Sequence, residues 1–123
     1  MHVIETAKDN ILAIRIDGKI ETKDMESFLR EAETRMSRHE KLRVYVEFEK
    51  FPTISLQALW EDLKFVLPNF KRFEAKAVVA DMEWAEKLTE FVDRLFPSIH
   101  LRLFDKDEGE KAMNWLLQED LDD

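Results

Sequence analysis

The spacing of apolar residues along the chain changes several times, and each change marks an element. Leu42, Val44, Val46 and Phe48 alternate with polar neighbours, which is typical of a strand with one drier face. Residues 75–81 are a nearly continuous apolar run, which predicts a central strand covered on both faces. With the weaker patterns included, strands are expected at 3–6, 10–18, 42–48, 75–81 and 98–104.

Helical spacing fills the intervals between these strands. Apolar side chains recur three and four positions apart after Thr22, which we expect to cap the first helix, and again after Ser55. A third helical face begins at Trp84, and a fourth helix is expected over 107–117. Pro68 and Pro97 are expected to end or kink the second and third helices, because proline lacks the N–H that a helix requires.

The resulting order is ββαβαβαβα. Strands separated by single helices indicate parallel crossovers, while the opening hairpin adds one antiparallel strand. The sequence therefore predicts an α/β fold, with a five-stranded mixed sheet and four helices. Residues 1–118 are expected to form one domain, followed by an acidic tail at 119–123.

Charge and composition narrow the class of protein. The net charge of −8 provides no basic footprint for nucleic acid and disfavours anionic membrane surfaces. Cysteine is absent, so neither disulfides nor thiol chemistry enter. No secretory leader and no apolar run long enough to span a bilayer is evident. We therefore expect a cytoplasmic protein that does not insert into membranes.

No motif for catalysis or for a cofactor is evident. The three histidines, His2, His39 and His100, lack ligand-type partners at helical spacing, so neither a metal site nor a cofactor is expected. Phosphate-binding glycine motifs and the nucleophile elbow are also missing. The sequence thus favours a protein that is not an enzyme.

Aromatic residues are numerous, with three Trp and nine Phe. Most are expected in the core, because Trp60, Trp84 and Trp115 lie on apolar helix faces. The remainder could line an apolar pocket or a dimer surface. Phe51, Phe65 and Phe73 break the local patterns and are the candidates for exposure.

Three segments carry a family resemblance: "LWEDLKF" at 59–65, "FEAKAVVADMEWAEKL" at 73–88 and "FDKDEGEKAMNWL" at 104–116. In this order they resemble the bacterial SpoIIAA-like family, whose fold is grouped with the STAS and CRAL-TRIO domains. The resemblance spans nearly the whole chain. It implies a non-catalytic, regulatory binding or interaction module.

The same resemblance locates a regulatory position. Phospho-regulated STAS domains begin the helix after this strand with an Asp-Ser-Ser-Gly-like segment, whose first serine is phosphorylated. With Ile54 as anchor, Ser55 occupies the aspartate position and Leu56 the phosphoserine position, so the usual switch residue is missing. Ser55 is then explained as a helix N-cap. A one-residue shift would instead make Ser55 a switch, because a helix N-terminus favours phosphate.

Two functions remain open. The first is protein interaction through the loop at 49–54, with Phe51, Thr53 and Ser55 as interaction or switch candidates. The alternative is a carrier or sensor of an apolar, lipid-like small molecule. Its groove would lie between the sheet and the second and third helices, lined by Leu56, Trp60, Phe65, Trp84 and Phe91. A homodimer formed through exposed aromatic residues is compatible with either.

Overall fold

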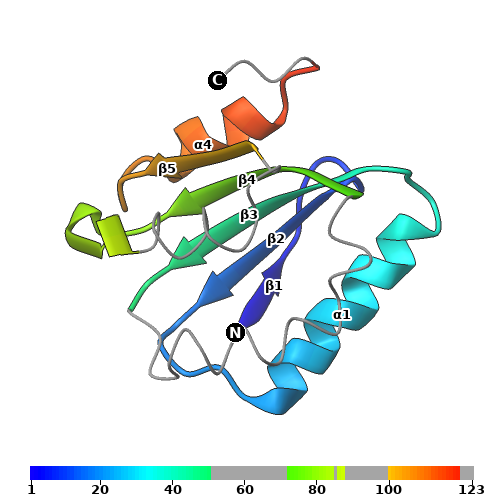
Figure 1. Cartoon of the computed structure of the whole chain (residues 1–123), viewed down its shortest axis with the longest axis horizontal. Coiled ribbons are helices and arrows are strands. Elements are labelled where there is room, and N and C mark those ends of the chain that lie inside the picture. Colours follow the sequence, from blue (N-terminus) through cyan, green and yellow to red (C-terminus); the bar gives the residue numbers. More distant parts are fainter. Residues whose placement is uncertain (51–71, 85, 88–99, 120–123) are drawn as a thin grey trace.

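A five-stranded mixed sheet organises the molecule. The computed structural model describes residues 1–50, 72–84, 86–87 and 100–119. The strands are β1 (His2–Ile4), β2 (Ile11–Ile16), β3 (Leu42–Phe48), β4 (Phe73–Val79) and β5 (His100–Phe104). They lie side by side in sequence order, with β1 antiparallel to β2 and the others parallel (Figure 1). The predicted α/β class and the five-stranded mixed sheet are confirmed.

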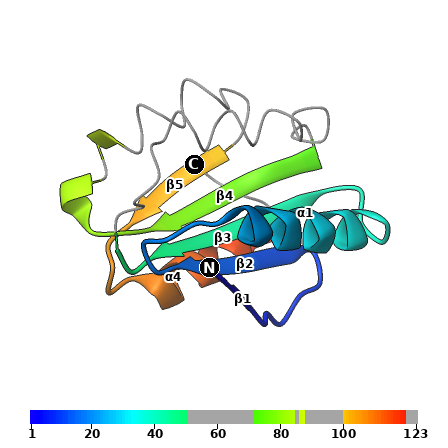
Figure 2. The same ribbon diagram turned by 90° about the horizontal axis from the view of Figure 1, so that it is seen from below.

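Two complete helices lie within the described residues. These are α1 (Thr22–Met36) and α4 (Gly109–Leu116), and residues 82–84 and 86–87 are also helical. Figure 2 shows α1 above β1 and β2, and α4 below β4 and β5. The helix expected from Ser55 lies outside the described residues, as does most of the helix expected from Trp84.

The face that α1 covers is built from one alternate set of strand residues. Leu12, Ile14 and Ile16 of β2 form a buried cluster with Val44 and Val46 of β3. Ala32 and Met36 of α1 pack into the same cluster, as their helical spacing predicts.

The opposite face is covered by α4 and is rich in small side chains. Ala13, Ala75 and Ala77 lie on this face, and Ala112 of α4 is fully buried against it. These alanines let the helix backbone approach the sheet closely, while Trp115 fills the remaining space beside Phe104 at a ring-centroid distance of 6.2 Å.

Three local predictions were wrong. The N-cap of α1 is Glu21 and not Thr22, because Asp24, three residues later, accepts the Glu21 backbone N–H at 2.8 Å. Phe73 is only 6% exposed, since it begins β4 beside Leu42 in the cluster under α1. In β3, Arg43 and Tyr45 are buried, so both faces of that strand are dry along most of its length.

Candidate binding pocket at the carboxyl edge of the sheet

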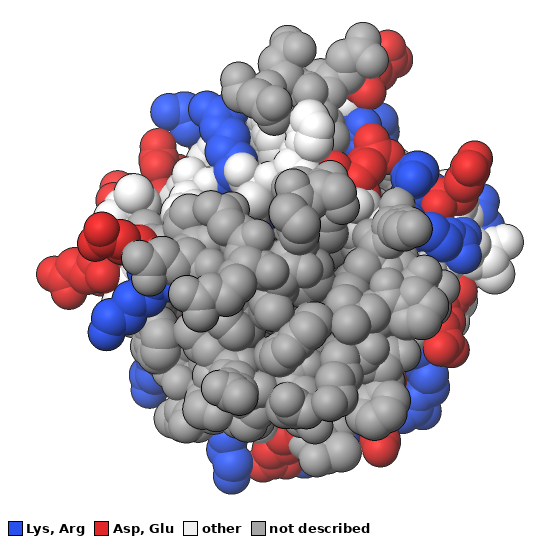
Figure 3. Space-filling view, in the orientation of Figure 1, with Lys and Arg blue, Asp and Glu red and all other residues white. Residues whose placement is uncertain are grey.

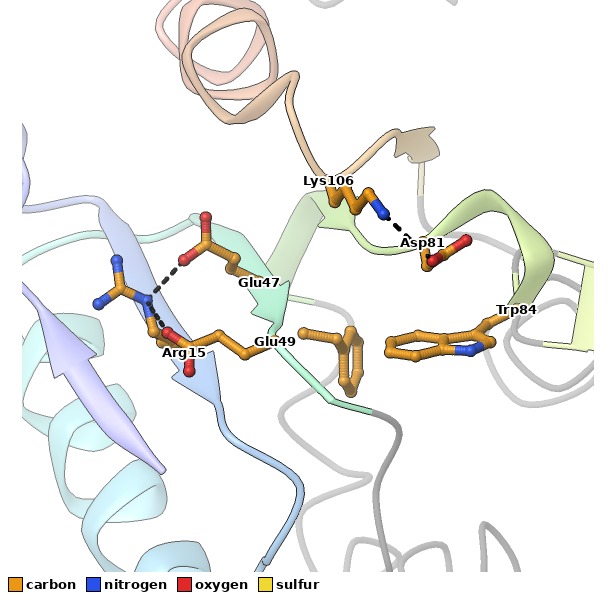
Figure 4. A pocket seen from close by; sticks show the side chains of 7 residues that line it. Arg15, Glu47, Glu49, Asp81, Trp84 and Lys106 are labelled. Carbon is orange, nitrogen blue, oxygen red and sulfur yellow. Dashed lines mark hydrogen bonds and ion pairs between the residues drawn. The ribbon is translucent and has the colours of Figure 1, made fainter.

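The four parallel strands end at the same edge of the sheet, at the left in Figure 1. In open α/β sheets this carboxyl edge is where ligands usually bind. A pocket of about 440 Å³ lies there, lined by residues at or just after the ends of β2, β3, β4 and β5. Figure 4 shows Arg15, Glu47 and Glu49 on one side, and Asp81, Trp84 and Lys106 on the other.

A guanidinium and two carboxylates form the first side of the pocket. Arg15 Nε lies 2.6 Å from Glu47 Oε2 and 3.2 Å from Glu49 Oε1. The hydrogen bond to Glu47 raises the pKa of Arg15. Strand register explains the contact, because Arg15 and Glu47 are direct partners across β2 and β3 and point to the same face.

Glu47 also connects the pocket to the start of α4. Its Oε1 accepts the Tyr45 hydroxyl at 3.1 Å, and burial raises the pKa of Tyr45 to about 12. A Cβ added at Gly109 would lie 2.8 Å from that hydroxyl oxygen. Glycine at the first helical position therefore lets α4 lie directly over Tyr45.

The second side of the pocket is built on the turn after β4. Asp81 Oδ1 accepts the backbone N–H of Glu83 at 3.0 Å, and Asp81 Oδ2 lies 3.5 Å from Lys106 Nζ. The hydrogen bond from Glu83 lowers the pKa of Asp81. Asp81 thus starts the helical residues that carry Trp84 and remains ionised at neutral pH.

Aromatic side chains supply the apolar part of the lining. Phe48 and Trp84 are both half-buried, line the pocket, and pack against the buried Val78 and Ala80. The pocket therefore combines charged groups of both signs with an aromatic wall.

Of the residues proposed from sequence as a site, Trp84 is the one that lies within the described residues, and it lines this pocket. Glu49, the first residue of the expected interaction loop, lines it too. The others lie outside the described residues: Phe51, Thr53, Ser55, Leu56, Trp60, Phe65 and Phe91.

Sequence patterns did not reveal the charged members of the pocket: Arg15, Glu47, Asp81 and Lys106 were not among the candidate site residues. Their position offered a signal, because Glu47, Asp81 and Lys106 lie at or within two residues of the end of a predicted strand, where parallel strands converge. Arg15 lies three residues before the end of the strand predicted at 10–18. Glu47 and Arg15 also share a sheet face, but that follows only once the register is known.

Elsewhere, the partly buried Lys76 is notable. Burial lowers the pKa of Lys76, in the middle of β4, to about 8.

Within the described residues, no three His, Cys, Asp or Glu side chains gather in a way that could hold a metal ion. Nor does any helix in that part of the chain have the length and apolar character to cross a membrane.

Comparison with known proteins now adds to this geometry. A mixed α/β sheet with its pocket at the carboxyl edge is typical of small ligand- or partner-binding domains. The SpoIIAA-like family model matches residues 11–117. The chain therefore belongs to the SpoIIAA-like family, and the resemblance seen in the sequence is confirmed. Neither the curated proteins nor the solved structures contain a match to this chain.

Proposed function

We propose that this protein is a non-catalytic, regulatory STAS-like binding module that recognises a protein partner at the carboxyl edge of its sheet. The observation that carries the proposal is the arrangement of the pocket. Its ionisable side chains are held in ion pairs with one another beside an aromatic wall, as suits recognition. Family membership supports the same class.

The chemistry of the pocket favours binding over turnover. A general acid at neutral pH needs a raised carboxyl pKa, whereas the pKa of Asp81 is lowered. Glu47 already contacts Arg15 at 2.6 Å through Oε2 and accepts the Tyr45 hydroxyl through Oε1, so both of its oxygens are engaged within the protein. Among the described residues lining the pocket there is no serine, threonine, cysteine or histidine to act as a nucleophile.

The proposed interaction surface continues from Glu49 into the loop at 49–54 and its candidates Phe51, Thr53 and Ser55. In our proposal the module lacks the phosphoserine switch, because Leu56 occupies that position and Ser55 caps the following helix. Phosphate found on Ser55 or Thr53 in protein from the native host would overturn this part of the proposal.

Site-specific photo-crosslinking tests the module directly. A benzophenone amino acid replaces Lys106, at the exposed rim of the pocket, and in a matched control it replaces Glu33 on α1. We expect a discrete protein adduct from the Lys106 position only, competed away by excess unmodified protein. The partner, identified by mass spectrometry, must then bind the purified protein. Equal labelling from both positions, or reproducible turnover of a substrate, would contradict the proposal.

The alternative proposal is a carrier or sensor of an apolar small molecule. It rests on the half-buried Trp84, which packs against the buried Val78 and Ala80, as do Phe48, Leu101 and Leu103. The rest of the groove would be Leu56, Trp60, Phe65 and Phe91. Native mass spectrometry of gently purified protein should then show an added apolar mass. Bare protein, together with unchanged Trp fluorescence across a lipid panel, would end this alternative.

A further inference from the structure

Acidic groups dominate the surroundings of the pocket. Within the described residues, the segments that follow the parallel strands, at 17–21, 49–50, 80–84, 86–87 and 105–108, carry nine acidic and four basic side chains. At the opposite end of the sheet, residues 5–10, 37–41, 72 and 117–119 carry four of each, apart from His39. In Figure 3, acidic side chains lie at the left rim, the end where β2–β5 finish, with basic side chains beside them. The potential at the pocket therefore attracts cations.

Two carboxylates of the pocket, those of Glu49 and Asp81, can give up their present ion pairs with little loss of stability. Glu49 is 50% exposed and lies 3.2 Å from Arg15, which keeps its shorter contact with Glu47 if Glu49 turns away. Asp81 meets Lys106, 70% exposed, at 3.5 Å through Oδ2, while Oδ1 keeps the Glu83 N–H. Ion pairs this exposed contribute little to stability, so an incoming cation can replace them.

The aromatic wall matches a particular kind of cation. Arginine and lysine carry an apolar methylene stem behind the charged group, and the stem gains by lying on apolar surface. Trp84 provides such a surface on the same side of the pocket as Asp81 (Figure 4), and Phe48 lines the same pocket. A small inorganic cation would leave this wall unused.

We infer that the pocket receives an arginine or lysine side chain from a protein partner, which pairs with Glu49 or Asp81 and lays its stem on Phe48 and Trp84. The inference rests on the proposed function, because it names the chemistry of the partner that the module recognises. It assigns Glu49 and Asp81 as the recognition residues and leaves Glu47 to hold Arg15 in place.

Chemical-shift titration with defined peptides tests it. The probe is a blocked Gly/Ser-rich decapeptide with two arginines, and the matched probe carries citrulline, which has the same shape without the charge. Amide and indole N–H signals of the labelled protein are followed, with the Trp84 indole assigned by Trp84→Phe. We expect saturable shifts at Glu49, Asp81 and Trp84, with millimolar affinity for the isolated peptide.

The affinities of the two peptides and of the protein variants are expected to differ by measurable factors. The citrulline peptide should bind about two- to fivefold more weakly, since one exposed charge pair contributes about that factor in affinity. The double variant Glu49→Gln/Asp81→Asn keeps side-chain size and the Asp81 hydrogen bond to Glu83, and should lose a similar factor. Glu33→Gln removes one charge at the balanced end and should bind as the parent does.

Three results would overturn the inference: no saturable shift at the pocket, equal affinity for the citrulline peptide, or undiminished binding by the double variant. Agmatine binding as tightly as the peptide would assign the pocket to a small free cation and also overturn it. If the peptides do not bind but crosslinking at Lys106 still captures a verified partner, the proposal of a binding module is supported. Only the inference that the partner supplies an arginine or lysine is then wrong.

Discussion

Tyr45 is a buried residue that hydrogen-bonds to a charged side chain and lies under the start of α4. Its hydroxyl donates to Glu47, lies under Gly109, and has its pKa raised to about 12 because burial disfavours the phenolate. Since Tyr45 is the one tyrosine in the chain, its ionisation can be followed without interference from another phenol.

The first prediction concerns alkaline pH. The folded pKa of Tyr45 lies above its ordinary value of 10, so the folded state holds the proton more tightly. The stability that this provides is complete below pH 10 and is lost as pH rises towards 12. Phenolate absorbance at 295 nm should show a midpoint near 12 in folded protein and near 10 in concentrated urea. A midpoint near 10 with the circular dichroism unchanged would contradict the buried hydroxyl.

A second prediction concerns Gly109. In Gly109→Ala the new methyl group would meet the Tyr45 hydroxyl at 2.8 Å, so urea unfolding should show a loss of about 1 kcal/mol, the low end for overpacking. Tyr45→Phe removes the opposing oxygen, and Gly109→Ala should cost less in that background. Gly18, at φ 110°, gives the control, because Gly18→Ala should cost the same in both backgrounds. Additive losses for Gly109→Ala and Tyr45→Phe would mean that the contact is not formed.

Arg43 fixes the other end of α4. Its guanidinium is 8% exposed and donates to the backbone carbonyls of Leu116, Gln118 and Glu119 and to the Glu74 carboxylate. The Leu116 carbonyl is one that the end of α4 leaves without a helical partner, while Gln118 and Glu119 follow the helix. One side chain therefore caps α4 and holds the chain beyond it.

The third prediction follows from that cap. Arg43→Met should cost about 2–4 kcal/mol of unfolding free energy, because buried carbonyls and the Glu74 carboxylate lose a charged donor. Arg38→Met is the matched control, since Arg38 makes its ion pair with Asp9 at the surface and should cost at most about 1 kcal/mol. Urea unfolding of both variants provides the measurement, and similar losses would show that Arg43 is not a cap.

At the scale of elements, the sequence predicted where strands and helices lie better than which faces they bury. β3 was predicted with its observed bounds, and α1 began within a residue of expectation, because alternation and helical spacing are local signals. The second dry face of β3 was not foreseen, since Arg43 and Tyr45 read as polar until α4 is placed over them. Phe73 was misjudged for the same reason: its burial depends on β4 lying beside Leu42.

The residues of the candidate site also divide into those that the sequence pointed to and those that it did not. Trp84 was expected in the core from its place on an apolar helix face and was proposed as a groove residue from the surplus of aromatic side chains; it is half-buried and lines the pocket at the carboxyl edge. Arg15 and Asp81 are far apart in sequence, and single charges among 46 charged residues carry no local signature. Only the parallel order of the strands brings them to one edge.

At the scale of the whole molecule, the uneven distribution of charge is the main electrostatic feature. A net charge of −8 opposes compaction, and the excess of acid is concentrated in the loops at the carboxyl edge. Ion pairs such as that of Arg38 with Asp9 favour the compact folded state, but they are local and exposed. Salt screens both the repulsion and the ion pairs. Whether the free energy of unfolding rises or falls with added salt therefore reveals which of the two is larger.

Our last prediction is that repulsion dominates. Raising NaCl from low ionic strength to physiological strength should increase the free energy of unfolding by roughly 0.5 kcal/mol, because screening relieves acid–acid repulsion. Asp107→Lys places a cation among the acidic loops and should flatten this salt dependence. Glu33→Lys makes the same change in net charge on α1, near the balanced end, and should flatten it less. A fall in stability with added salt would show instead that the surface ion pairs outweigh the repulsion, and equal effects of the two substitutions would show that only the net charge matters.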